Sequence, residues 1–155
     1  MSQRDLEGKK APLFTGTDQD GNKITLKDYI GKKVILYFYP HDMTPTCTVQ
    51  ACNLRDAYVL LGRKGVQVIG VSTDDPAQHR KFIAKNSLPF PLIADTDLKI
   101  NKKYGVWQLK KFMGREFMGT VRTTFLINEK GIIEHIIRKP KSKIHSEEIM
   151  QLWDL

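Results

Sequence analysis

Two uninterrupted apolar runs alternate with two segments of helical spacing between residues 34 and 86. Val34–Tyr39 and Val66–Val71 are apolar at almost every position and rich in β-branched or aromatic residues, which indicates strands buried on both faces. Between them, apolar side chains recur every three or four positions from Val49 to Leu61, and a second helix is predicted over Ala77–Asn86. Strand, helix, strand and helix in succession predict parallel strands joined by right-handed crossovers.

Turn and breaker residues mark where these elements end. Pro40 follows the first run directly and ends that strand, because proline has no N–H to donate to a ladder. The next helix is expected to begin near Thr46, with Thr44 or Thr46 as its N-cap. Gly62 or Gly65 is expected to end it. A loop therefore separates the first buried strand from the first helix.

Three further segments have strand or hairpin patterns. Asp20-Gly21 lies between two short strand-like stretches, 14–17 and 23–26, and predicts an N-terminal β-hairpin. Residues 122–137 contain two apolar runs around a Glu-Lys-Gly turn and predict a second antiparallel hairpin. Pro89–Ala94 is a short strand whose prolines suit the edge of a sheet.

The remaining segments complete the predicted fold. Asp97–Tyr104 is expected to form a brief helix, residues 106–121 to be mostly loop, and Ser146–Leu155 to form a final amphipathic helix. We predict one α/β domain over residues 1–155, with a thioredoxin-like fold in which helices flank a mixed central sheet and an N-terminal β-hairpin is added. In open sheets of this kind the active crevice lies beyond the carboxyl ends of the strands.

Composition and charge exclude several classes of protein. The 155 residues are 41% hydrophobic and 27% charged, as in soluble globular proteins. The net charge of +8 is spread along the chain without a nucleic-acid-binding motif, so we expect a solvated surface and no nucleic-acid partner. The polar N-terminus lacks a signal-peptide core, and no apolar run approaches the roughly 18 residues of a membrane span. A cytoplasmic protein without a membrane partner is expected.

Both cysteines lie at the start of the first helix. Two thiols in a chain of this length do not form a disulfide framework, and a reducing compartment would keep them free. Cys47 is placed in the first helical turn, where unpaired N–H groups and the positive end of the helix dipole favour a thiolate. The alternative is an inert, buried thiol. The position of Cys47 favours redox chemistry.

The spacing of Cys47 and Cys52 constrains what they can do together. Residues five apart on an α-helix have Cα atoms roughly 8.7 Å apart, whereas disulfides rarely exceed about 7 Å. A bond between them would therefore require the start of the helix to unwind. The alternative is a metal site that includes His41, but no second pair of ligands accompanies the two cysteines. None of the four histidines shows the sequence pattern of a base with an orienting partner.

The segment from Pro40 to Cys47 resembles a known signature. Pro40-His-Asp-Met-Thr44-Pro-Thr-Cys47 matches the Pro-x-x-x-Thr-x-x-Cys motif of the peroxiredoxins. Cys47-Thr-Val-Gln-Ala-Cys52 is similar to the atypical two-cysteine group called bacterioferritin comigratory protein or peroxiredoxin Q. The likeness extends over nearly the whole chain, with one departure: relatives often have glycine where Thr46 stands, so this loop must keep a negative φ at residue 46.

The resemblance implies a role for each of five residues. Cys47 corresponds to the peroxidatic cysteine, Cys52 to the resolving cysteine, Thr44 to the hydroxyl that holds the peroxide, Pro40 to the ring that shields the thiolate, and Arg122 to the active-site arginine. Donors at these positions would stabilise charge on the departing oxygen as the O–O bond breaks. Each of four residues also has a purely structural alternative. Thr44 could serve only as an N-cap and Cys52 only as a packed core thiol. Pro40 could serve only to end the strand, and Arg122 could be only a surface charge.

The implied activity is that of a thiol-dependent peroxidase without metal or other cofactor. Cys47 would reduce hydrogen peroxide or an organic hydroperoxide and become a sulfenic acid, Cys52 would condense with it, and thioredoxin or a similar dithiol would reduce the disulfide. A monomer is expected, with a weak homodimer as the alternative. The competing functions are a thioredoxin-like disulfide reductase and a non-enzymatic redox-sensing or nucleic-acid-binding module.

Overall fold

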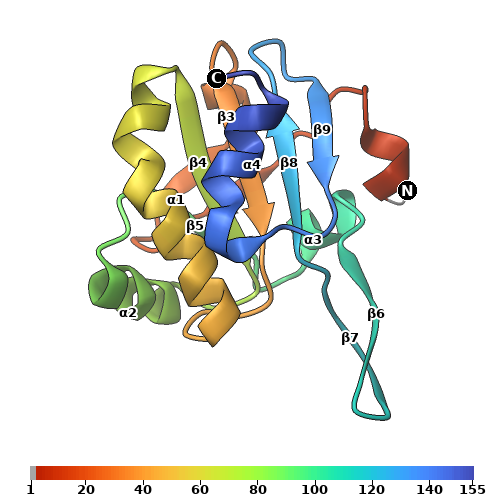
Figure 1. Ribbon diagram of the computed structural model, residues 1–155. Helices are drawn as coiled ribbons and strands as arrows, with labels where there is room; N and C mark the ends of the chain where they lie inside the picture. Colours follow the sequence, from red (N-terminus) through yellow and green to blue (C-terminus); the bar gives the residue numbers. More distant parts are fainter. Residues whose placement is uncertain (1–2) are drawn as a thin grey trace.

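A mixed sheet of five strands forms the centre of the fold (Figure 1). The computed structural model describes residues 3–155. The central strand β3 (Lys33–Phe38) is parallel to β4 (Val66–Ser72), which is parallel to the edge strand β5 (Leu92–Ala94). On its other side β3 pairs antiparallel with β8 (Thr123–Ile127), and β8 with β9 (Ile133–Ile137). The predicted thioredoxin-like α/β fold, its parallel crossovers and the edge position of β5 are confirmed.

One face of the sheet is covered by the N-terminal part of the chain. Alternate residues of β3, namely Val34, Leu36 and Phe38, belong to the core on this face. The predicted hairpin is present as β1 (Thr15–Thr17) and β2 (Lys23–Thr25), which are followed by a 3-10 turn. Apolar side chains in and next to these elements and the short helix α3 (Lys99–Lys103) also belong to this core, among them Phe14, Ile24, Leu26, Ile100 and Tyr104.

The other face carries the longer helices. Helices α1 (Pro45–Arg63) and α4 (His145–Leu152) pack against each other, and α2 (Pro76–Asn86) lies beside α1 (Figure 1). Ile35 and Tyr37 point to this face from β3. The helices contribute the apolar side chains Cys47, Ala51, Leu54, Leu61, Phe82 and Ile149 to the core beneath them. A strand apolar on both faces thus separates two cores, as the uninterrupted run predicted.

The prediction of mostly loop for residues 106–121 is wrong. This segment forms a hairpin of β6 (Trp107–Phe112) and β7 (Arg115–Thr120), which projects from the body of the protein (Figure 1). Met113 and Gly114 connect the strands with φ of 50° and 76°, the conformation of a tight two-residue hairpin turn. Because most of its side chains are exposed on both faces, the sequence lacks the alternation by which a half-buried strand is identified.

Several element ends differ from the prediction by a few residues. Helix α1 begins at Pro45, α3 spans Lys99–Lys103, and the last helix α4 begins at His145 and ends at Leu152. Val49, predicted on the apolar stripe of α1, is 39% exposed, because the stripe that faces the sheet is the one that carries Cys47, Ala51 and Leu54. In the part of the chain described, no helix combines the length and apolarity of a membrane span.

Candidate active site

Cys47 lies in the first turn of α1, directly beyond the carboxyl end of β3. Its side chain is 1% exposed. Thr44 occupies the N-cap position, with φ −76° and ψ 151°, but its side chain makes no capping hydrogen bond. Its hydroxyl donates instead to the carbonyl oxygen of His41, 2.9 Å away. Thr46 lies within the helix and has no positive φ, as expected for a β-branched residue. The hydroxyl of Thr44 is thus held on the loop rather than on the helix end.

Arg122 is brought to Cys47 by strand pairing. Phe38 at the end of β3 pairs with Thr123 at the start of β8, so Arg122 lies level with the start of the loop that joins β3 to α1. This loop, residues 39–44, is called the catalytic loop below. The Nη2 of Arg122 donates to the Sγ of Cys47 over 3.1 Å. Arg122 is therefore in contact with the thiol and is not an isolated charge at the strand end.

Gln50 holds the other terminal nitrogen of the guanidinium. It lies one turn after Cys47 on α1, is fully buried, and accepts a 2.6 Å hydrogen bond at Oε1 from Nη1 of Arg122. Gln50 is not among the site residues predicted from the sequence. The available signal was a polar residue at position i+3 from a candidate nucleophile, on the stripe of α1 that faces the sheet. Both terminal nitrogens of the guanidinium thus donate hydrogen bonds to side chains of α1, and this fixes the plane of the group.

The surroundings of the sulfur are dominated by positive charge. The guanidinium of Arg122 and the N-terminal end of α1 both favour negative charge at Sγ. The pKa of the Lys110 ammonium group is lowered, first by burial and then by the nearby charge of Arg122. Burial raises the pKa of the Tyr37 hydroxyl well above its usual range, and the charge of Cys47 adds to this effect. Tyr37 is therefore a neutral neighbour of the thiol.

A cavity of about 310 Å³ opens beside the catalytic loop. Pro40 and His41 form its wall on the loop, while Lys110 and the apolar side chains of Trp107 and Phe117 line it from the β6–β7 hairpin. The β6–β7 hairpin, in a segment predicted to be mostly loop, thus contributes to the cavity. The remaining lining residues are Thr73, Met118, Gly119 and Thr120.

Cys52 lies on the same helix but has a different environment. Its Sγ is half-buried and 3.7 Å from Oδ1 of Asn86, the last residue of α2. Helix α1 continues without interruption through both cysteines, and both thiols are free. The unwinding that a bond between them requires stays a prediction.

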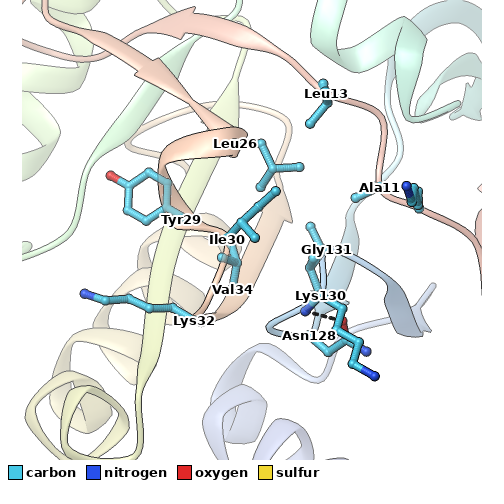
Figure 2. A pocket seen from close by; sticks show the side chains of 12 residues that line it. Ala11, Leu13, Leu26, Tyr29, Ile30, Lys32, Val34, Asn128, Lys130 and Gly131 are labelled. Atoms are coloured by element: carbon cyan, nitrogen blue, oxygen red, sulfur yellow. Dashed lines mark hydrogen bonds between the residues drawn. The ribbon is translucent and has the colours of Figure 1, made fainter.

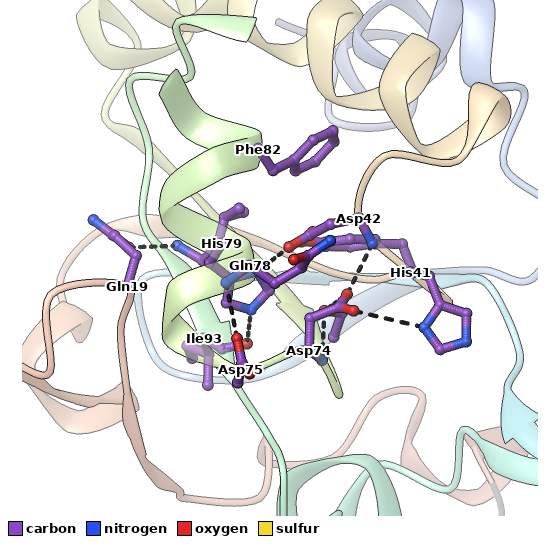
Figure 3. Close-up of polar contacts among 12 residues, drawn as sticks. Gln19, His41, Asp42, Asp74, Asp75, Gln78, His79, Phe82 and Ile93 are labelled. Atoms are coloured by element: carbon purple, nitrogen blue, oxygen red, sulfur yellow. Dashed lines mark hydrogen bonds and ion pairs between the residues drawn. The ribbon is translucent and has the colours of Figure 1, made fainter. Parts of the chain in front are cut away.

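Histidine partners that the sequence did not indicate are present in the fold. His79 Nδ1 lies 2.6 Å from Oδ2 of Asp42, and both side chains are fully buried (Figure 3). His145 Nδ1 lies 2.6 Å from Oε1 of Glu148. No sequence pattern could indicate the first pair, because it joins residues 37 positions apart. Asp42 lies within the catalytic loop, and His79 contacts it from α2.

The one group of potential metal ligands within residues 3–155 consists of Asp42, Asp74 and His79. Both ring nitrogens of His79 already have acceptors, Oδ2 of Asp42 and the carbonyl oxygen of Ile93. The ring therefore has no free lone pair in this geometry, and the cluster fits a hydrogen-bond network better than a metal site. The alternative metal site of Cys47, Cys52 and His41 does not form such a group.

A second cavity, of about 200 Å³, lies away from both cysteines (Figure 2). Its wall is mainly apolar and is made by the N-terminal segment around Leu13, the turn around Ile30, and the β8–β9 connection at Asn128. Lysines 10, 32 and 130 also line it, but no residue predicted for the site does. Of these two cavities, only the one beside the catalytic loop is lined by a predicted site residue, Pro40.

Comparison with known proteins gives a consistent family assignment. The sequence profile described as the AhpC/TSA family matches residues 7–136. The chain is 43% identical over 143 residues to peroxiredoxin Bcp of Escherichia coli, covering 92% of each protein. It is 43% identical over 144 residues to peroxiredoxin Bcp of Bacillus subtilis, covering 93% of this chain and 92% of the relative.

Solved structures give the same result. The C47S mutant of PrxQ from Xylella fastidiosa superposes with a TM-score of 0.86 at 29% identity, over 91% of this chain and 87% of that one. Bacterioferritin comigratory protein of Xanthomonas campestris, described by its alkyl peroxide reduction activity, superposes with a TM-score of 0.85 at 28% identity, over 91% and 90%.

Proposed function

The chain belongs to the AhpC/TSA family and is similar over nearly its whole length to Bcp peroxiredoxins, and we propose on this premise that Cys47 is the peroxidatic cysteine of a thiol-dependent peroxidase. The observation that carries the proposal is the contact of Arg122 Nη2 with Cys47 Sγ at 3.1 Å in the first turn of a helix. A cation and a helix N-terminus at one sulfur favour the thiolate, which is the nucleophilic form.

The first step is attack of the Cys47 thiolate on one peroxide oxygen. The S–O bond forms as the O–O bond breaks, sulfur is oxidised to the sulfenic acid, and the other oxygen leaves with the electron pair and takes a proton to give water or an alcohol. Arg122 stabilises the charge that develops on the two oxygens. Thr44 contributes its hydroxyl once a peroxide replaces the carbonyl of His41 as its partner, and the ring of Pro40 limits access of water.

The second step joins the two cysteines. The Cys52 thiolate attacks the sulfenic sulfur, hydroxide leaves and is protonated to water, and a disulfide forms. Because α1 is continuous through both residues, this step requires the first turns of the helix to unwind. An external dithiol, which we expect to be thioredoxin in a reducing cytoplasm, then exchanges with the disulfide and restores both thiols.

The cavity beside Pro40 supports organic hydroperoxides as substrates besides hydrogen peroxide. Its apolar wall of Trp107 and Phe117 provides room for a hydrocarbon group next to the site of attack. The alkyl peroxide reduction activity stated for the Xanthomonas campestris relative supports the same substrate class. The protein acts as a monomer in this proposal, because one chain supplies both cysteines and the arginine.

Two cysteine variants test the proposal. Cys47→Ser should abolish peroxide consumption, whereas Cys52→Ser should react once with a stoichiometric amount of peroxide and then fail to cycle with thioredoxin. Mass spectrometry of the products should show a sulfenic acid on Cys47 of the Cys52→Ser protein and a disulfide in the unmodified one. Sustained turnover by the Cys47→Ser protein would refute the assignment, and insulin reduction without peroxide consumption would identify a disulfide reductase instead.

A further inference from the structure

The loop between β3 and α1 is anchored at Asp42. The carboxylate of Asp42 is buried and accepts at each oxygen: Oδ1 from the hydroxyl of Tyr39 at 2.6 Å, and Oδ2 from Nδ1 of His79 at 2.6 Å (Figure 3). Tyr39 belongs to the loop itself, whereas His79 belongs to α2. One side chain therefore ties the beginning of the catalytic loop to a helix that takes no part in the chemistry.

A second carboxylate, that of Asp74, binds the backbone of the same part of the loop. Oδ2 of Asp74 accepts from the backbone N–H of Asp42 at 2.8 Å and from the hydroxyl of Ser72 at 2.7 Å. Its Oδ1 lies 3.7 Å from Nδ1 of the exposed His41. The side chain and the backbone of residue 42 are thus both bound to the segment that runs from the end of β4 into α2.

His79 is itself held at both ring nitrogens. Nε2 lies 3.0 Å from the carbonyl oxygen of Ile93, and Nδ1 faces Asp42. Since both partners are acceptors, both contacts are hydrogen bonds when the ring carries two protons, or when Asp42 carries the second proton. In either protonation state, separating the pair would leave a buried polar group without a hydrogen-bond partner. Because that costs free energy, the pair opposes movement of the loop away from α2.

Beyond Asp42 the anchoring ends abruptly. Met43 has a φ of 68°, a left-handed conformation that is unfavourable for a residue with a side chain. The next contacts are local ones, from Thr44 to His41 and from Thr48 to Thr44. The start of α1 is then held by the contact of Arg122 with Cys47 and Gln50. Unwinding of α1 would relieve the strain at Met43, but it would also move the adjacent residue Asp42 and so weaken the buried pair.

We propose that Asp42 and His79 form a latch that holds the catalytic loop folded and must loosen when α1 unwinds at the adjacent Met43. The inference rests on the proposed peroxidase function. Asp42 and His79 are positioning residues, because they act on Cys47 only through the loop. By stabilising the folded loop, the latch speeds the reaction with peroxide and slows the disulfide step, which needs the unwound helix.

The latch therefore decides between two fates of the sulfenic acid. While the loop is folded, the Cys47 sulfenate stays exposed to a second hydroperoxide: its sulfur attacks one oxygen, the O–O bond breaks, and the products are a sulfinic acid and water or an alcohol. When the helix unwinds, Cys52 reaches the sulfur and the disulfide forms instead. A weaker latch shifts the outcome from sulfinic acid to disulfide.

Two variants weaken the latch by different amounts. His79→Gln breaks the contact of the imidazole with Asp42, and Tyr39→Phe removes a single hydroxyl while it keeps the aromatic ring that stacks on Tyr37. His135→Gln is the matched control, since His135 is on β9, away from the loop. Stopped-flow fluorescence would give the second-order rate constant for peroxide and the first-order rate constant for the disulfide, and mass spectrometry the sulfinic acid formed per turnover.

We expect opposite changes in the two rate constants. In His79→Gln, oxidation of Cys47 should slow about tenfold, because the loop is less well positioned. Disulfide formation should accelerate about tenfold, the factor that corresponds to one lost hydrogen bond, and sulfinic acid should decrease. Tyr39→Phe should show the same signs with smaller factors, and His135→Gln no change.

The outcomes separate this inference from the proposed function. If the unmodified protein does not consume peroxide, the function itself fails. If it cycles normally but disulfide formation in both latch variants is unchanged or slower at equal folded fraction, the latch is refuted while the function stands. Thermal melts establish the folded fraction, and the milder Tyr39→Phe decides the question should His79→Gln unfold.

Discussion

Replacement of Arg122 by methionine is the most direct perturbation of the proposed chemistry. Methionine keeps the length of the side chain but removes the charge and both hydrogen bonds, the 3.1 Å contact with Cys47 Sγ and the 2.6 Å contact with Gln50 Oε1. A charge-assisted hydrogen bond is worth roughly 1.5–3 kcal/mol. In the transition state the guanidinium also faces the departing oxygen, where a lost donor costs about 10²- to 10³-fold in rate.

We therefore expect the second-order rate constant for oxidation of Cys47 in Arg122→Met to fall by about 10²- to 10³-fold, or about 3–4 kcal/mol. The assay is stopped-flow fluorescence of the reduced protein with increasing peroxide, for which Trp107 in the cavity wall is the natural reporter. Gln50→Leu is the matched control: it keeps the cation but removes the acceptor that orients it, and should cost about tenfold.

The size of the change tests the reasoning. A loss of less than about fivefold in Arg122→Met, with an unchanged melting temperature, would mean that the contact with Cys47 is structural and contributes little to the transition state. An effect of Gln50→Leu as large as that of Arg122→Met would show that orientation of the guanidinium, and not its charge, carries the contribution.

Two further predictions concern the cavity and the stability of the fold. Phe117→Ala should lower kcat/KM for cumene hydroperoxide about fivefold, through loss of about 40 Å² of apolar contact, and leave hydrogen peroxide unaffected; equal losses for both would show that the hairpin does not select the substrate. Burial lowers the pKa of His145, so the unfolded chain binds the extra proton first. The free energy of unfolding should therefore decrease below about pH 6.5, by at most about 1.4 kcal/mol per pH unit. Denaturant melts between pH 5 and 8 should show a flatter profile for His145→Gln, and an identical profile would contradict this account.

Much of the fold follows from local pattern. The run from Val34 to Tyr39 is apolar at every position, because β3 lies between two cores. Prolines and glycines at the ends of elements fixed the loop before α1 and the hairpin turn at Gly21, since both residues restrict the backbone without help from tertiary contacts. The hairpin β6–β7 was missed for the converse reason: its side chains are exposed on both faces, so burial imposed no period on them.

The sequence also pointed to candidate residues for the chemistry, but not to how they meet. The spacing from Pro40 to Cys47 and the cysteine pair pointed to a reactive thiol at a helix start, which is a local property of the chain. The contact of Arg122 with Cys47 depends on the register of β8 against β3, which joins residues 75 positions apart.

Tertiary structure alone decided the polar partners. Gln50 is defined as a partner of Arg122, and His79 as a partner of Asp42, only when strands and helices distant in sequence pack together. Such pairs produce no periodic pattern in the sequence. A hydrogen bond requires two side chains to lie about 2.6–3.2 Å apart in space, but it requires no particular spacing along the chain. The sequence by itself determined that a thiol stands at the start of a helix, whereas the folded chain decided which groups hold that helix in place.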